Sequence, residues 1–363
     1  MLENIEEEYL AFCKRLDSIN QYINLLDSEK NFFKSALVDE EIQEKDYIIK
    51  LIEDIKYNMN SQVIYNAIII SLYSCYENFI DNILIKYLET ISNLGIKYEK
   101  LPKNILDNQI IQLGNYLSNT NRYKNYDLKY VDVINNLNNC LNGESEYKLN
   151  TRILITHSGN LGIDSLKTLF GQIGINNIFE KIKYNKFFEE YYMIENDVAD
   201  IDELRRIFSS IEEKILFTIL FDLVNRRNGI AHSWNEDDRL SIQTIQDKYI
   251  KFFSVFGKTI KDIIINEIYN ILFENNLLYE FLTIHQVINN KIVCLNNGNQ
   301  KITKNDYIYA VSGDNKTKTI KIINIQINRN DVELVEKMNV DIGIEVDGYI
   351  KEGYKFYHYN NAL

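Results

Sequence analysis

Residues 223–234 decide the fold, because two helix-forming segments of the chain meet there. They read Leu223-Val224-Asn225-Arg226-Arg227-Asn228-Gly229-Ile230-Ala231-His232-Ser233-Trp234. Apolar side chains recur every three or four positions over residues 207–224, and again over residues 240–273. Such spacing gathers apolar side chains on one face of a helix. The sequence therefore predicts two long helices joined by this stretch.

Arg227 and His232 are the chemically distinctive residues of this junction. Nowhere else in the chain do two arginines, an amide and a histidine crowd together. Arg227 and His232 lie five positions apart around Gly229, a spacing that lets a chain leaving a helix bring both side chains to the same side. A guanidinium neutralises charge on a phosphate, and an imidazole moves protons near neutral pH. The pair is therefore suited to phosphodiester chemistry.

The composition is that of an ordinary soluble protein, with 45% hydrophobic and 25% charged residues in a chain of 363. This length suffices for a main domain and one smaller module. The acidic start, residues 1–8, lacks the basic and then apolar pattern of a secretory signal, and no run of eighteen residues is wholly apolar. We therefore expect a cytoplasmic protein without a membrane partner.

The charge balance and the cysteines limit the kinds of site. A net charge of −12 argues against broad, non-specific binding of nucleic acid but leaves room for a local basic cleft. The excess acid lies in the first 290 residues. No pair of cysteines has the spacing of zinc ligands, so we expect reduced thiols, no metal and no cofactor. The cysteines are Cys13, Cys75, Cys140 and Cys294.

Helical periodicity extends through the N-terminal half of the chain. It predicts an amphipathic helix over residues 2–26, a charged helix over 40–57 and a strongly apolar helix over 63–91. Glu77 lies inside the apolar helix, where an unpaired acid would cost several kcal/mol. Glu77 is therefore expected either to meet Arg226 or Arg227 or to lie on the helix surface.

Several other polar residues have simpler structural interpretations. His157 is interpreted as a loop or capping residue rather than a catalyst. Asp200 or Asp202 is expected to cap the helix entering residues 223–234, and Asp237 or Asp238 the helix leaving them. Residues 257–259 imitate the end of a phosphate-binding loop, but they lie in an amphipathic helix and lack the required earlier glycine. We therefore assign residues 257–259 no role in nucleotide binding.

After Asn290 the pattern changes to short β-branched or aromatic runs separated by glycine-containing turns. This pattern predicts a small antiparallel barrel or sandwich. We place the domain boundary near residue 288, with a helical domain over 1–287 and a β domain over 288–363. The predicted strands are Lys291–Cys294, Tyr307–Val311, Ile320–Ile327, Asp341–Val346 and Lys355–Tyr359.

Residues 227–233 resemble the Arg-x4-His signature of HEPN domains. The surrounding sequence resembles the larger HEPN variants of the RiboL-PSP type, over roughly residues 55–275 and in the family's order. The motifs that carry this resemblance are Tyr76-Glu77-Asn78-Phe79-Ile80, Ser158-Gly159-Asn160-Leu161, Leu169-Phe170 and Ile173-Gly174-Ile175, followed by the Arg/His motif.

The resemblance implies an all-α fold in which a symmetric dimer pairs two motifs to form one metal-independent, RNA-cleaving cleft. Arg227 would stabilise the scissile phosphate, and His232 would handle the proton of the attacking 2′-hydroxyl or of the leaving oxygen. Asn228 would orient the phosphate or the histidine, and Glu77 would hold the arginine. Arg226 would be either a second RNA contact or a solvated charge.

Two alternatives stay open at this stage. Many HEPN domains are non-catalytic scaffolds or dimerisation modules, so the helical domain would then only dimerise. A latent nuclease is the other alternative, kept inactive until a regulatory protein or a phage trigger changes its state. Intact Arg227, Asn228 and His232 favour an active endoribonuclease over a degenerate site.

The C-terminal part resembles the second, β-barrel domain of translation GTPases such as elongation factor Tu and initiation factor two. The resemblance lies in residues 319–327, 331–333, 340–346 and 350–357, with Asn339 where those barrels usually have a glycine. The GTPase domain is absent, so no GTP hydrolysis is implied. The resemblance implies that the barrel either delivers a structured RNA such as tRNA or docks a translation factor, a ribosome or a viral protein. With the HEPN resemblance, it suggests a toxin or an anti-phage effector.

Overall fold

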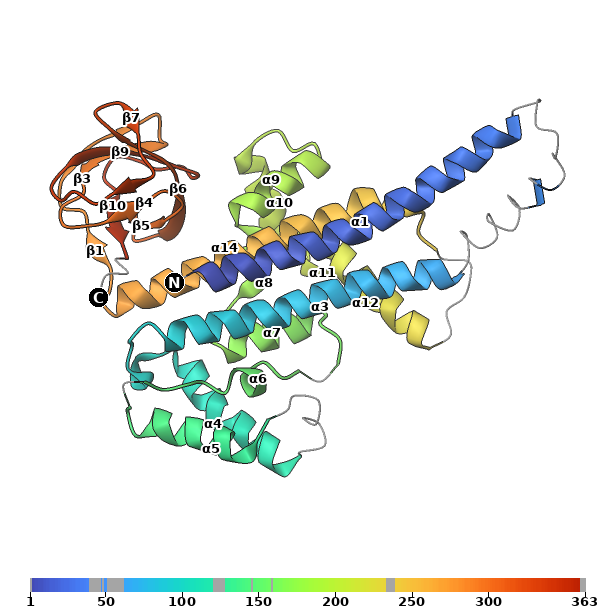
Figure 1. Cartoon of the computed structure of the whole chain (residues 1–363), viewed down its shortest axis with the longest axis horizontal. Coiled ribbons are helices and arrows are strands. Elements are labelled where there is room, and N and C mark those ends of the chain that lie inside the picture. The colour runs from blue at the N-terminus through green and yellow to red at the C-terminus, as the bar shows by residue number, and fades with distance from the viewer. Residues whose placement is uncertain are drawn as a thin grey trace.

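The computed structural model describes residues 2–38, 47, 49–50, 62–119, 128–144, 146–157, 159–232 and 239–359. Figure 1 shows three long helices, α1 (Glu3–Val38), α3 (Gln62–Ser92) and α14 (Lys251–Glu274), running along one another, with shorter helices on both sides and a curled β-sheet at one end. The structure therefore confirms a mainly α-helical protein with a small β domain. Of the helix predicted over residues 40–57, the structure describes only residues 47 and 49–50, which are helical.

Helix α3 forms the centre of the helical part because apolar side chains along most of its length are buried. It packs against α1, α12 (Thr218–Ala231) and α14. Its length and composition would suffice to cross a membrane, but 61% of its most apolar window is buried inside the protein. Such burial is what a core helix of a folded bundle requires, and α3 confirms the helix predicted over residues 63–91.

Gly257 allows α1 and α14 to approach closely. A Cβ atom at this position would lie 2.9 Å from Cδ1 of Phe12 on α1, and closer still to its Cε1 atom. The Phe12 ring is itself buried and stacks on Phe79 of α3, with ring centroids 4.2 Å apart. Gly257, the glycine of the segment that resembles the end of a phosphate-binding loop, is therefore a packing residue.

The Gly257→Ala variant is expected to destabilise the protein by about 1–3 kcal/mol, because the added methyl group overpacks the contact with Phe12. Urea unfolding followed by circular dichroism measures the change. Gly114→Ala is the matched control, since Gly114 is also helical but has nothing within 4 Å of its Cβ position. That substitution should be neutral or stabilise the protein by up to about 1 kcal/mol. Equal behaviour of the two variants would contradict the packing role.

The shorter helices surround this core. The helix predicted over residues 207–224 is divided, since α10 ends at Ser210 and two further helices follow it before residue 232. Asp200 is a helix cap as expected, but of α10 and not of the helix that enters the motif, and it accepts hydrogen bonds from the backbone N–H groups of Asp202 and Glu203 at 2.9 and 2.8 Å. The bounds are η1 (Tyr98–Lys100), α4 (Lys103–Ser118), α5 (Tyr130–Leu141), α6 (Thr151–Leu154), α7 (Ile163–Gln172), α8 (Ile178–Lys183), α9 (Lys186–Glu195), α10 (Ile201–Ser210) and α11 (Glu213–Leu216).

The last long helix begins at Ile242. It runs through α13 (Ile242–Thr244) and a π-helical segment, η4 (Ile245–Ile250), into α14. The predicted caps Asp237 and Asp238 lie outside the described residues. Ser241 caps the helix instead, because its hydroxyl accepts a hydrogen bond from the N–H of Thr244 at 3.0 Å.

The C-terminal sheet is antiparallel and curled, with the strand order β1-β10-β5-β6-β9-β3-β2. We call residues 279–358 the half-barrel. Its strands β1 and β2 precede the predicted boundary at 288, so the boundary lies instead between the end of α14 and residue 279. The strands are β1 (Tyr279–Glu280), β2 (Ile284–Ile288), β3 (Ile292–Asn296), β4 (Ile302–Thr303), β5 (Tyr307–Val311), β6 (Thr317–Ile327), β7 (Asn330–Asp331), β8 (Leu334–Val335), β9 (Asp341–Val346) and β10 (Lys355–His358).

The half-barrel packs directly on α1 and α14. The ring of Tyr309 on β5 packs against the Phe273 ring, with centroids 5.2 Å apart, and its hydroxyl donates to Asn270 at 2.8 Å. Glu6 accepts a hydrogen bond from the hydroxyl of Tyr307 at 2.7 Å. Burial alone would raise the pKa of Glu6, but hydrogen bonds from Tyr307 and Lys261 lower the pKa overall. The contact therefore keeps Glu6 ionised.

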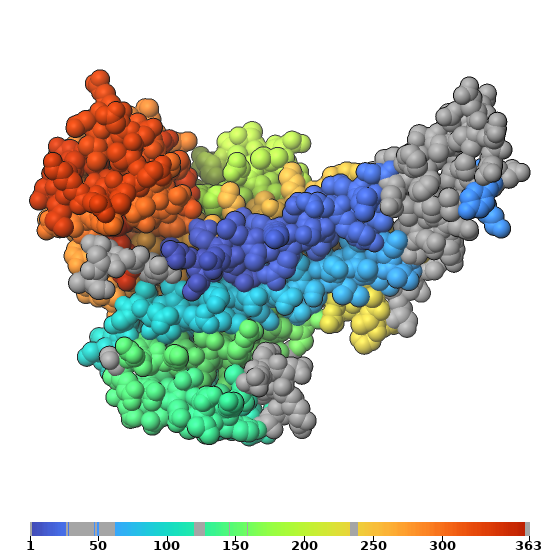
Figure 2. All heavy atoms as spheres, viewed as in Figure 1, coloured from blue at the N-terminus to red at the C-terminus, as the bar shows by residue number. Residues whose placement is uncertain are grey.

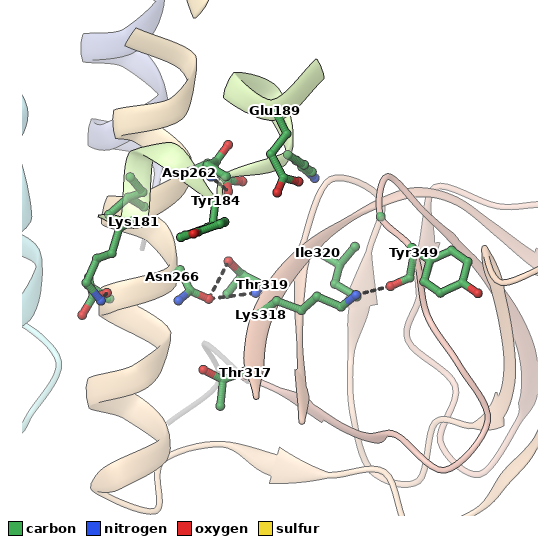
Figure 3. Close-up of a pocket in the computed structure, with 15 residues that line it drawn as sticks. Lys181, Tyr184, Glu189, Asp262, Asn266, Thr317, Lys318, Thr319, Ile320 and Tyr349 are labelled. Carbon is green, nitrogen blue, oxygen red and sulfur yellow. Dashed lines mark hydrogen bonds and ion pairs between the residues drawn. The ribbon is translucent and has the colours of Figure 1, made fainter. Parts of the chain in front are cut away.

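A cavity of about 380 Å³ lies beside this contact, between α9, α14 and strand β6 (Figure 3). Lys186, which lines it, forms an ion pair with Asp347 at 3.0 Å, and Asn266 accepts a hydrogen bond from the N–H of Thr319 at 3.0 Å. Three lysines and three acids contribute to its lining, so neither sign of charge prevails there. The six residues are Lys181, Lys186, Lys318, Glu189, Asp262 and Glu267.

Candidate functional site

The Arg/His motif lies on α12, which stays helical through most of the stretch that was expected to join two helices. Its buried residues Leu220, Leu223 and Val224 fix one face in the core, and the helix contacts α3. The helix runs through Gly229 to Ala231, and the N–H of His232 donates to the Gly229 carbonyl at 3.0 Å. In Figure 2 the yellow surface of α12 is exposed beside the light-blue start of α3. The motif therefore lies at the surface end of a core helix.

Arg227 is half-buried and held in a defined position. Its guanidinium carbon lies 5.3 Å from the ring centroid of Tyr73 on α3, which is a cation–π distance. One guanidinium nitrogen also donates to the side-chain carbonyl of Asn228 at 3.5 Å. A cation fixed in this way has already lost part of its conformational freedom, so it needs little reorganisation to meet an anion.

Tyr73 of α3 supplies the ring against which the Arg227 guanidinium packs. Its hydroxyl donates to Glu77 at 2.8 Å and accepts a hydrogen bond from the N–H of Leu161 at 3.0 Å. Burial raises the pKa of the Tyr73 phenol, and the neighbouring Glu77 carboxylate raises that pKa further. The phenol therefore stays protonated near neutral pH, which is the state that donates to Glu77.

Asn160 connects the loop between α6 and α7 to the motif. Its amide nitrogen donates to the side-chain oxygen of Asn228. The same loop is tied to α3 through Leu161, whose carbonyl accepts a hydrogen bond from Tyr76 at 2.7 Å. Three segments distant in sequence, residues 73–77, 160–161 and 227–228, thus form one connected polar cluster. Asn228 lies at its centre, in contact with both Arg227 and Asn160.

Glu77 lies in this cluster but reaches Arg227 only indirectly. The structure shows a hydrogen bond between Glu77 and Tyr73, and in the described part of the chain no ion pair joins Glu77 to either arginine. The expectation of a direct carboxylate–guanidinium contact is therefore replaced by a relay through Tyr73. Glu77 orients the phenol, and the phenol ring faces the arginine.

His232 is exposed at the C-terminal end of α12. Five residues correspond to about 1.4 helical turns, so His232 lies about 140° around the helix axis from Arg227. The two side chains of one chain consequently leave α12 in different directions. This differs from the expectation that a chain leaving the helix near Gly229 brings both side chains to the same side.

Arg226 is buried, which corrects its prediction as an RNA contact or a solvated charge. It is only 5% exposed, its Nε atom donates to Asp222 at 2.5 Å, and another guanidinium nitrogen donates to Tyr65 at 2.9 Å. Tyr249 also donates to the same oxygen of Asp222. Arg226 therefore joins α12 to α3 and to the π-helical segment η4, and its position is structural.

Sequence patterns did not single out Tyr73, Asp81 or Asn160 as site residues. Asn160 lies within the Ser158–Leu161 motif, and Tyr73 precedes Glu77 by one helical turn, so both had a weak signal. His157, interpreted as a loop residue, forms an ion pair with Asp81 at 3.3 Å next to this cluster. Asp81 is one further turn along α3 from Glu77, and only the fold brings the loop to it.

The fold and the site define a class. A helical bundle that presents Arg227, Asn228 and His232 at the end of a core helix, supported by a polar cluster on a second core helix, is a HEPN-type domain. The model of one HEPN family, described as RiboL-PSP-HEPN, matches residues 35–266, and the chain belongs to this family. A comparison with curated proteins gave no match. The half-barrel lies outside the matched residues.

Proposed function

We propose that this protein is a metal-independent endoribonuclease that cleaves RNA with Arg227 and His232. Arg227 carries the proposal, because its guanidinium is half-buried, oriented by Tyr73 and Asn228, and unlike Arg226 is not engaged by an acid in the described structure. A cation in this state is suited to stabilise negative charge as it develops on a phosphate. Family membership supports the same proposal.

The proposed reaction uses the 2′-hydroxyl of RNA as the nucleophile. The 2′-oxygen forms a bond to phosphorus while the bond from phosphorus to the 5′-oxygen breaks, which leaves a 2′,3′-cyclic phosphate and a 5′-hydroxyl. His232 accepts the proton of the 2′-hydroxyl or supplies the proton of the leaving oxygen. Arg227 stabilises the phosphorane, Asn228 orients the phosphate, and Glu77 acts through Tyr73.

We propose further that two chains complete the site. Arg227 and His232 leave α12 in directions about 140° apart, so one chain presents them to different parts of its surface. A two-fold axis near the exposed end of α12 would bring both motifs to one groove, with one His232 for each of the two proton transfers. Such a homodimer would also place the two guanidinium groups on the same phosphate backbone.

The half-barrel is proposed to present a structured RNA, with tRNA favoured, to this groove. It holds 10 basic and 9 acidic residues after position 290, whereas the preceding residues are strongly acidic. Its resemblance to the second domain of translation GTPases motivates the choice of RNA. Asn339, which stands where those barrels usually have a glycine, adopts a left-handed backbone conformation with φ of 56°. We propose a cytoplasmic toxin or anti-phage effector, controlled by a regulatory protein or a phage trigger.

The deciding experiment incubates the purified full-length protein with total tRNA in the presence of EDTA. We expect cleavage, and products that end in 2′,3′-cyclic phosphate, detected by their conversion to open phosphates with a cyclic phosphodiesterase. Cleavage that depends on magnesium, or products with 3′-hydroxyl ends, would contradict the proposed chemistry. Complete absence of cleavage with several RNAs would favour the non-catalytic dimerisation module.

A further inference from the structure

The ring of His157 has a hydrogen-bond partner at one nitrogen and a carboxylate at ion-pair distance from the other. Nδ1 lies 2.9 Å from the carbonyl oxygen of Gly159, and Nε2 lies 3.3 Å from a carboxylate oxygen of Asp81 on α3. A neutral imidazole has one N–H group, whereas an imidazolium has two. Only the imidazolium can therefore donate to the Gly159 carbonyl and at the same time pair its positive charge with Asp81.

The two contacts of His157 fix the start of the loop that carries Asn160. Gly159 has φ of 109°, a conformation that a residue with a Cβ atom rarely adopts, and the turn aims its carbonyl at the His157 ring. The next residue, Asn160, donates to Asn228 of the motif. Asp81 anchors the ring to α3, the same helix that supplies Tyr73 and Glu77. His157 is thus linked to Arg227 through three contacts, His157 to Gly159, Asn160 to Asn228, and Asn228 to Arg227.

The surroundings of His157 favour its charged form. Asp81 and Glu77 contribute negative charge from α3, and Asp164 of α7 lines the same cavity of about 390 Å³ as His157. Helix α4 contributes only the uncharged Gln112 and Asn115 to that cavity. The hydrogen bond to Asp81 is the largest cause that raises the pKa of His157, against the lowering effect of burial.

We propose that His157 is a positioning residue whose protonated ring holds Asn160 against Asn228, so that the site keeps its geometry in weakly acidic solution and loosens as the ring loses its proton. Because the pKa of His157 is raised in the folded protein, the stabilisation is present in full below the unfolded pKa of about 6.5 and is lost as pH rises through the folded pKa. The effect on cleavage rests on the proposed ribonuclease activity, but the effect on the loop does not.

The loop is tested by hydrogen–deuterium exchange of the full-length protein, read in peptides that cover residues 155–162. Wild type is compared with His157→Gln at the same pH, because intrinsic exchange rates depend on pH. At about pH 6 the variant should exchange about fivefold faster, as one lost hydrogen bond implies, and at about pH 9 the two proteins should be nearly equal. His285→Gln on the half-barrel is the matched control and should leave these peptides unchanged.

A second variant tests the charge argument without removing the ring. Asp81→Asn keeps a hydrogen-bond acceptor but removes the negative charge, so the NMR titration of the His157 ring C–H should shift to lower pH by about one unit. Equal exchange of wild type and His157→Gln at both pH values would overturn the proposal. So would a His157 ring that titrates below about pH 6 in the wild type.

The outcomes separate this proposal from the proposed function. If the loop responds as expected but no RNA is cleaved, His157 still positions the loop and the nuclease proposal fails. If RNA is cleaved and the ratio of wild-type to His157→Gln rates stays constant with pH, the positioning role fails and the nuclease proposal stands. Both proposals together predict that this ratio falls as pH rises.

Discussion

The Arg227→Ala variant is expected to lose RNA cleavage by about a hundredfold to a thousandfold while it stays folded. Removal of one preorganised donor to developing charge typically has an effect of this size. The side chain is half-buried on the ring of Tyr73, so its truncation removes a cation–π contact worth only about 1 kcal/mol. Initial rates on tRNA in EDTA measure the first effect, and thermal unfolding measures the second.

His232→Ala should reduce cleavage by about a hundredfold to ten-thousandfold, because water would have to replace the imidazole as the proton donor or acceptor. His232 is exposed at the end of α12, so the variant should unfold like the wild type. Arg206→Ala and His285→Ala are the matched controls, since both remove an exposed side chain of the same type outside the site. Cleavage by Arg227→Ala or His232→Ala at the wild-type rate would remove that residue from the chemistry.

In contrast to Arg227→Ala, the neighbouring Arg226→Ala variant is expected to lose much of its free energy of unfolding, without a direct effect on the chemical step. Its guanidinium donates hydrogen bonds to Asp222 and Tyr65, and the residue is only 5% exposed. Removal of one member of a buried ion pair typically costs 3–5 kcal/mol. The side chain of Asp222 is 29% exposed, so we expect a loss nearer about 3 kcal/mol.

Urea unfolding of Arg226→Ala measures this loss. A rescue variant sharpens the test, because Arg226→Met combined with Asp222→Asn removes both charges and should recover much of the stability. Arg206→Ala again serves as the control and should change the free energy of unfolding by less than about 0.5 kcal/mol. If Arg226→Ala were as stable as the wild type but bound RNA more weakly, the result would support the earlier interpretation of Arg226 as an RNA contact.

Much of the architecture followed from local patterns in the chain. The apolar helix predicted over 63–91 is α3, and the strands predicted over 307–311 and 341–346 coincide with β5 and β9. Each pattern is local, since period and turn chemistry are written in neighbouring residues. Strand β2 was missed because residues 284–288 have no strong turn signal before them, and their strand character depends on pairing with β3.

The break between α10 and α12 shows the limit of periodicity. Residues 207–224 have a continuous helical spacing, yet the chain turns at Ile211, where the backbone is extended with ψ of 134°. Neither proline nor glycine marks this turn, and the side chain of Ile211 packs against the helical core there. The boundary of the half-barrel was misplaced for the same reason, because β1 gains strand character only by pairing with β10.

By itself, the sequence determined the helical core, the β-rich C-terminal part and the position of the Arg/His motif, because hydrophobic period and residue chemistry are local properties. Only the tertiary structure decided that Arg226 is buried and Arg227 half-exposed, since adjacent residues of a helix point about 100° apart and the core covers one of those directions. The tertiary structure alone also placed Asn160 on Asn228, 68 residues away in the chain, and Tyr73 beneath Arg227. Contacts between such distant segments depend on how whole helices pack, which no short stretch of sequence encodes.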